Sequence, residues 1–181
     1  IIEGKKIAVD FGMGIFGSLV YSPNELIKGV DLIVLSHYHT DHSGFLLLLS
    51  EVNPGAPIFM SEPTKQGAQI MISNNLKIHN DKQRKISKIG GERQNFFYDE
   101  RMVWKFFNRV TNPIIRPGWQ TWKDWEIGFY PSGHTRGAMM VIIVTGKRAY
   151  LITGDISSHD QPLVKGVMLP PKEFFGDRLK G

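Results

Sequence analysis

The chain has 181 residues, a formal net charge of +5 and no cysteine. That length suits a single domain over residues 1–181, and the lack of cysteine excludes disulfides and thiolate metal ligands. There is no secretory signal and no apolar span of membrane-crossing length, so we expect a cytoplasmic protein with no membrane partner.

Strand and helix signals alternate in the first half of the chain. Short apolar runs predict strands over 7–10 and 32–35, and the second run is rich in the β-branched residues typical of buried strands. A helix over 44–51 follows, then a short strand over 58–60. A second helix is expected over 62–78, because Pro63 suits a first helical turn.

The second half begins with a polar, basic segment over 81–91, which we expect to be mobile. An amphipathic helix is predicted over 98–110. The tryptophans at 119, 122 and 125 indicate a loop that leads into a strand. Strands are predicted over 125–130, 138–144 and 149–152. This order of elements predicts an α/β fold.

The candidate site is the motif H-x-H-x-D-H at residues 37–42, directly after the strand predicted over 32–35. Side chains two apart on extended backbone point the same way, so His37 and His39 can reach one metal ion. Asp41 and His42 then face a second point close by. Imidazole and carboxylate groups are good zinc ligands, and they also accept manganese or iron. Unrelated surface histidines rarely show this spacing after a buried strand.

The motif resembles the signature of the metallo-β-lactamase superfamily, and other stretches match in the same order. Residues 7–12 resemble its first-strand aspartate motif, 130–135 its G-H-T motif, and 150–155 its strand that ends in a bridging aspartate. The resemblance implies an αββα sandwich that is incomplete in its C-terminal half.

Within the superfamily, the chain is most similar to the N-terminal part of the β-CASP nucleases, the branch of RNA-processing ribonucleases. The similarity lies in residues 35–44, 53–58, 61–65, 129–141 and 153–156. It implies a metal-dependent phosphodiesterase that cleaves RNA, and single-stranded DNA as a further substrate, with a hydroxide activated by two metal ions.

The resemblance also implies roles for individual residues. One metal is expected on His37, His39 and His134, a second on Asp41 and His42, and Asp155 is expected to bridge both. Asp41 is also expected to relay the proton of the nucleophile. Asp10 is expected to accept a hydrogen bond from a ligating histidine and so fix its orientation.

The chain departs from the family pattern at its end. The family has a further metal-ligating histidine on a later strand, whereas this chain ends at residue 181, before that position and before the β-CASP insertion. His79 and His159 stand at the wrong places to replace it. Three explanations stay open: a fragment, a split enzyme completed by a partner chain or a second copy, or a minimal variant with one tight and one weak metal. We expect an oligomer, because an incomplete sandwich exposes apolar surface and a strand edge.

Basic and aromatic residues alternate between 82 and 116. Such a segment can follow a phosphate backbone and stack bases, but a solvated helical hairpin has the same pattern. The candidate nucleic-acid contacts are Arg84, Lys85, Lys88, Arg101, Lys105 and Arg109.

Two other functions fit the same residues. The first is a small-molecule hydrolase acting on a β-lactam, lactone or thioester, because the same ions polarise carbonyl groups. The second is a non-catalytic, metal-stabilised subunit that binds nucleic acid, which the absent last histidine favours.

Overall fold

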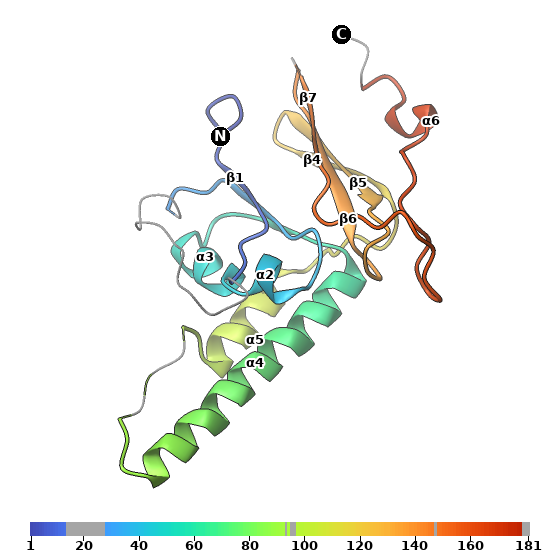
Figure 1. Cartoon of the computed structure of the whole chain (residues 1–181). Helices are drawn as coiled ribbons and strands as arrows, with labels where there is room; N and C mark the ends of the chain where they lie inside the picture. The colour runs from blue at the N-terminus through green and yellow to red at the C-terminus, as the bar shows by residue number, and fades with distance from the viewer. Residues whose placement is uncertain (14–27, 93, 95–96, 147, 179–181) are drawn as a thin grey trace.

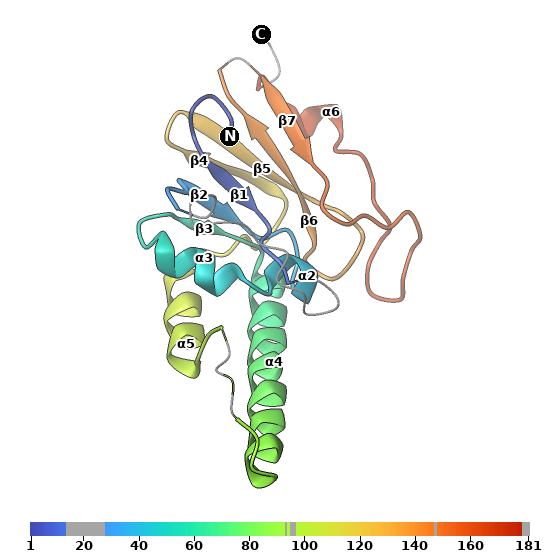
Figure 2. The ribbon, with the colours of Figure 1, turned by 60° about the vertical axis from the view of Figure 1, so that its left-hand side comes forward.

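Two β-sheets lie face to face, and most of the helices cover one side of the pair (Figures 1 and 2). The computed structural model describes residues 1–13, 28–92, 94, 97–146 and 148–178. Within these residues, no helix is both long and apolar enough to cross a bilayer.

The first sheet is parallel, with the order β1 (Ile7–Val9), β2 (Leu32–Val34) and β3 (Ile58–Phe59). Side chains on β2 alternate between its two faces, as pleated backbone requires. Leu32 and Val34 pack toward the second sheet, while Ile33 packs toward the helices. Both faces are therefore buried, which explains why the sequence of this strand is continuously apolar.

The helical layer consists of α2 (Thr40–Ser43), α3 (Leu46–Val52), α4 (Glu62–Lys88) and α5 (Glu100–Arg109). Helix α4 is capped by Ser61, whose hydroxyl accepts the Thr64 N–H at 3.1 Å. The distal half of α4 extends beyond the sheets beside α5 (Figure 2).

Helix α4 continues ten residues past the predicted end at 78, so the predicted helix was too short and the basic segment is helical as far as Lys88. The reason is that lysine, arginine and glutamine are good helix formers even without an apolar stripe. The buried Gln83 adds a tertiary contact, because its Oε1 accepts the Gln94 N–H at 2.8 Å.

The second sheet is antiparallel, with the order β4 (Gly118–Trp122), β5 (Trp125–Pro131), β6 (Met139–Val144) and β7 (Ala149–Ile152). The expected loop around Trp119 and Trp122 is instead strand β4. Trp122 pairs with Trp125 across a two-residue turn in which Lys123 has a φ of 56°. The three strands predicted after 125 are confirmed.

The inner faces of the two sheets form one core. Leu32 and Val34 from β2 meet side chains that alternate along β5 and β6, namely Trp125, Ile127, Phe129, Val141 and Ile143. On the outer side of the second sheet, the described residues supply only the short helix α6 (Lys172–Phe175), which Trp119 Nε1 holds through the Phe174 carbonyl at 2.7 Å. The α/β sandwich, incomplete in its second helical layer, is therefore confirmed.

Candidate metal centre

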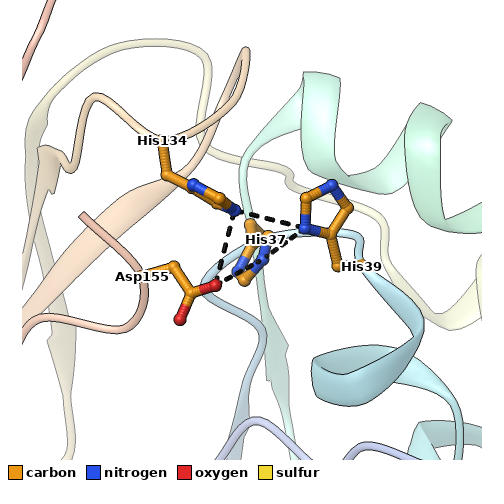
Figure 3. A group of neighbouring side chains, drawn as sticks. All are labelled: His37, His39, His134 and Asp155. Carbon is orange, nitrogen blue, oxygen red and sulfur yellow. Dashed lines mark hydrogen bonds and ion pairs between the residues drawn. The ribbon is translucent and has the colours of Figure 1, made fainter. Parts of the chain in front are cut away.

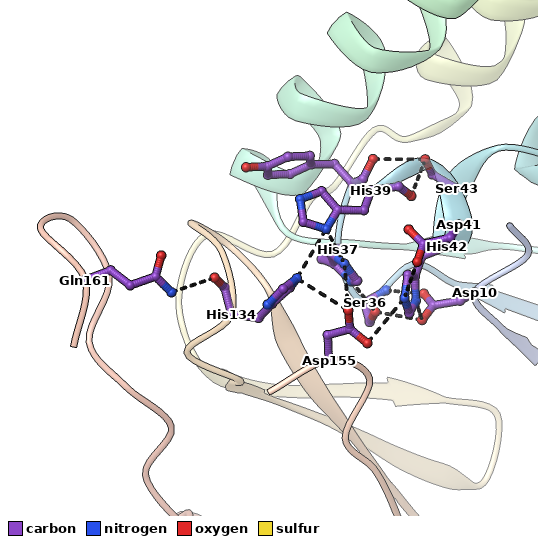
Figure 4. A network of polar contacts seen from close by, with 11 residues as sticks. Asp10, Ser36, His37, His39, Asp41, His42, Ser43, His134, Asp155 and Gln161 are labelled. Atoms are coloured by element: carbon purple, nitrogen blue, oxygen red, sulfur yellow. Dashed lines mark hydrogen bonds and ion pairs between the residues drawn. The ribbon is translucent and has the colours of Figure 1, made fainter. Parts of the chain in front are cut away.

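Four of the predicted metal ligands converge on one point, although they follow strands of both sheets (Figure 3). His37 and His39 follow β2, and Asp41 and His42 lie on α2. His134 lies in the turn between β5 and β6, and Asp155 follows β7. The fold brings together all six residues, and it places Asp10 beside them (Figure 4).

Four ligand atoms form the first cluster. His39 Nδ1 lies 3.2 Å from both His37 Nε2 and His134 Nε2. Asp155 Oδ2 lies 3.4 Å from His134 Nε2 and 3.8 Å from His37 Nε2. A tetrahedral ion with bonds of about 2.0–2.1 Å holds its ligand atoms about 3.3 Å apart. These four separations lie near that value, and all four atoms lie within 4.8 Å of one another, so the group can hold one cation.

Hydrogen bonds to Ser36 and Asp10 determine which ring nitrogen of His37 and of His42 carries the proton. Asp10 Oδ1 accepts the Ser36 N–H at 2.7 Å, and Asp10 Oδ2 accepts the Ser36 hydroxyl at 2.7 Å. The Ser36 oxygen, having donated its only proton, accepts from His37 Nδ1 at 3.1 Å. His42 Nδ1 donates to Asp10 Oδ2 at 2.8 Å. In the neutral histidines, both Nε2 lone pairs then point into the site.

Burial keeps the first cluster ready for a cation. The His37 side chain is only 1% exposed, and burial together with the neighbouring His42 and His39 lowers its pKa to about 4. Burial also lowers the pKa of His39. Both rings are therefore neutral at neutral pH and offer lone pairs, which is the form that binds metal. The hydrogen bond to Asp10 raises the pKa of His42 instead.

A second cluster lies beside the first. His42 Nε2 is 3.4 Å from Asp155 Oδ1 and 3.8 Å from Asp41 Oδ2. Asp155 thus directs one oxygen to each cluster, as expected of a bridging carboxylate. The remaining histidines are engaged elsewhere, since His79 bonds to the Gln94 carbonyl and His159 to the Ser158 hydroxyl. The histidine and aspartate side chains of both clusters are suitable ligands for divalent cations. Among the described residues, the second cluster offers fewer ligands than the first.

The segment after β1 holds α2 in place. Phe11 N–H donates to the His42 carbonyl at 2.7 Å, and Met13 N–H donates to the Thr40 carbonyl at 2.9 Å. Between them, Gly12 lies so close that an added Cβ would stand 1.5 Å from the Asp41 carbonyl oxygen. Sequence reasoning missed this role of Gly12. The only local signal was its place two residues after Asp10.

The six basic residues proposed to contact nucleic acid fall into two groups. Arg109 donates to the Pro54 and Ala56 carbonyls at 2.8 Å each, beyond the end of α3. Lys105 pairs with Glu51 at 2.8 Å, and Arg84 pairs with Asp81 at 3.5 Å. The other three lie on α4 and α5 and take part in none of the ion pairs seen among the described residues: Lys85, Lys88 and Arg101.

Comparisons with known proteins agree with this geometry. Residues 1–65 match the family described as the metallo-beta-lactamase superfamily. Integrator complex subunit 11 of Danio rerio is 32% identical over 164 residues, which cover 85% of this chain and 26% of that protein. Endoribonuclease ysh1 of Emericella nidulans is 28% identical over 167 residues, covering 87% of this chain and 18% of its own. This chain thus spans about a quarter or less of these two relatives.

Among solved structures, a HARLDQ-motif mutant of a metallo-beta-lactamase from Cronobacter sakazakii aligns with a TM-score of 0.50 and 13% identity. The alignment covers 96% of this chain and 60% of the other, and at that identity it speaks for the fold alone. Residues 1–65 thus match the metallo-beta-lactamase superfamily, and the relatives and the fold agree with that match.

Proposed function

We propose that the protein is a metal-dependent phosphodiesterase that cleaves RNA. The observation that carries the proposal is the convergence of three histidines and Asp155, with the second Asp155 oxygen turned to another His and Asp pair. The ribonuclease names among the relatives support RNA as the substrate, and so do the β-CASP-like stretches of the chain.

The chemistry divides between cations and side chains. Divalent cations held there, of which we propose zinc, would lower the pKa of bound water and offset charge on phosphate oxygens. His37, His39 and His134 would supply ring nitrogens to hold the first cation. Asp155 fixes the spacing between the two clusters. Asp41, whose side chain is 45% exposed at the rim of the site, is placed to accept the proton released from water.

We propose that RNA is held by basic side chains of α4 and α5 that take part in none of the ion pairs seen among the described residues. Lys85, Lys88 and Arg101 are the candidates, since Arg84, Lys105 and Arg109 already bind partners within the chain. The net charge of +5 favours a polyanionic substrate.

Cleavage of labelled RNA oligonucleotides tests the proposal. We expect EDTA to abolish cleavage. His37→Ala and Asp155→Ala should each lower the cleavage rate by more than about 100-fold, because removing a residue that only supports a metal ligand already costs up to that much. His79→Ala is the matched control, because His79 lies on α4 outside both clusters. Cleavage that persists in EDTA or in both ligand variants would contradict the proposal. RNA binding without any cleavage would instead support a non-catalytic subunit.

A further inference from the structure

The turn that carries His134 is held by hydrogen bonds on both of its sides. On one side, the Gly137 carbonyl accepts the Ser61 hydroxyl at 2.7 Å and the Thr64 hydroxyl at 3.0 Å, which ties the turn to the start of α4. On the other side, Gln161 Nε2 donates to the His134 carbonyl at 2.9 Å and to the Gly133 carbonyl at 3.3 Å (Figure 4).

Gln161 belongs to a loop over 157–167 that begins two residues after Asp155 and carries none of the cluster ligands. The loop closes on itself. Val167 N–H donates to the Ser157 carbonyl at 2.6 Å, and Gly166 N–H donates to Asp160 Oδ1 at 2.8 Å. Gln161 and Val164 exchange backbone hydrogen bonds of 2.8 and 3.2 Å. The loop therefore holds its own shape and can act as a fixed support.

The loop is seated directly on the His134 turn. Ser157 N–H donates to the Ser132 carbonyl at 3.3 Å. Gly133 has a φ of 75°, and a Cβ there would stand 2.3 Å from the Val167 nitrogen. Only glycine allows this approach, so the backbone of the turn and that of the loop are in close contact.

We propose that Gln161 is a positioning residue for the first metal cluster. Its amide binds two successive carbonyls of the peptide that carries the His134 imidazole. Because the loop is continuous with Asp155, this contact fixes the 3.4 Å spacing between His134 Nε2 and Asp155 Oδ2. Ligand distances in metal sites lie within about 0.2 Å of standard values, so a turn that holds His134 less firmly should bind the metal more weakly. The inference rests on the metal site of the proposed function.

The test compares Gln161→Ala and Gln161→Glu with Leu163→Ala. The Gln161→Glu variant would keep the size of the side chain but place a carboxylate against two carbonyl oxygens, whereas Leu163 is 87% exposed in the same loop. The readouts are zinc affinity by chelator competition, the visible spectrum of the cobalt-loaded protein, and the unfolding midpoint of the metal-free protein.

We expect both Gln161 variants to lose about 10-fold in affinity, the lower end for outer-shell partners, with an altered cobalt spectrum. Leu163→Ala should change neither the zinc affinity nor the cobalt spectrum. The unfolding midpoints of the metal-free wild type and of all three variants should be the same. Unchanged affinity and spectrum in Gln161→Ala would overturn the inference, as would an equal loss in Leu163→Ala or a matching loss of metal-free stability. A wild-type protein that binds zinc but cleaves no RNA overturns only the proposed function.

Discussion

Asp10 orients side chains of both clusters through three hydrogen bonds. Its carboxylate accepts from the Ser36 N–H, the Ser36 hydroxyl and His42 Nδ1, and so orients one histidine of each cluster. It does this from a φ of 62°, a conformation that non-glycine residues adopt rarely and at a cost of order 1–3 kcal/mol. These contacts hold the strained backbone in place.

Asp10→Asn should weaken metal binding at the second cluster by about 10–100-fold, because an amide nitrogen cannot accept from Ser36 or His42. Titration calorimetry with zinc measures the effect. Asp31→Asn is the control, since Asp31 accepts the Lys6 N–H at 2.8 Å before β2, whereas the site follows that strand. Equal affinities in wild type and Asp10→Asn would refute this role.

His37 should make the metal-free protein sensitive to acid. Its folded pKa of about 4 lies below the ordinary 6.5, so the unfolded chain binds the proton more readily between these values. The free energy of unfolding should therefore fall as the pH drops from about 6.5 to 4, by at most about 3 kcal/mol. His42 has the opposite sign, because stabilisation from its raised pKa is lost as pH rises.

Urea unfolding between about pH 7.5 and 4.5, with EDTA present, measures this dependence. His37→Gln cannot take up the proton and should flatten the curve over the same range. A slope that is identical in the variant would assign the acid sensitivity to other groups.

At the scale of elements, the contact between the segment after β1 and helix α2 decides where Asp41 and His42 stand. Gly12→Ala should displace α2, because the new Cβ would overlap the Asp41 carbonyl oxygen at 1.5 Å. We expect a loss of stability of about 1–3 kcal/mol or more and loss of the second metal. Thermal unfolding and metal stoichiometry test this. Gly55→Ala is the control, since its Cβ would meet nothing within 4 Å; matching behaviour of the two variants would refute the argument.

The distal part of α4 gives a prediction for RNA binding. Lys85→Gln with Lys88→Gln should lower the affinity for single-stranded RNA and reduce the slope of log affinity against log salt by about 0.7 for each lost phosphate contact. Anisotropy titrations at several salt concentrations measure both quantities. Lys5→Gln with Lys123→Gln removes the same charge at residues paired with Asp124 and Asp31. Equal losses in the two double variants would mean that net charge alone matters.

The elements show what sequence can and cannot reveal. The strand over 32–35 and the motif after it were predictable because their signals are local. The strand at Trp119 and the last turns of α4 were missed, because neither has a clear apolar period. The hydrogen bonds from Arg109 to carbonyls more than fifty residues away were not predicted either. Gln161 was not singled out, because its partners are 27 and 28 positions distant. No local pattern announces such contacts.

For the whole molecule, the first cluster joins the two halves of the sandwich. His37 and His39 follow a strand of the first sheet, while His134 and Asp155 follow strands of the second. An ion bound to all four would stabilise the packing of one sheet on the other. Because unfolding separates the ligands, binding should add about 4 kcal/mol when the free ion exceeds its dissociation constant about 1,000-fold.

Thermal unfolding with zinc and then with EDTA tests this linkage. The midpoint should fall when EDTA removes the ion, and His134→Ala should largely remove the difference between the two conditions. A zinc-dependent shift of full size in His134→Ala would place the stabilising ion elsewhere.

The alternation of side chains along β2 limits which insertions and deletions this part of the sequence can accept during evolution. Odd-numbered positions from Ile33 through His39 serve the helical core and then the first cluster, whereas Leu32 and Val34 face the other sheet and Ser36 binds Asp10. Deleting one residue here would reverse this parity for core and metal ligands at once. Insertions or deletions that this stretch tolerates should therefore involve an even number of residues. A change that preserves the core then also preserves the metal ligands.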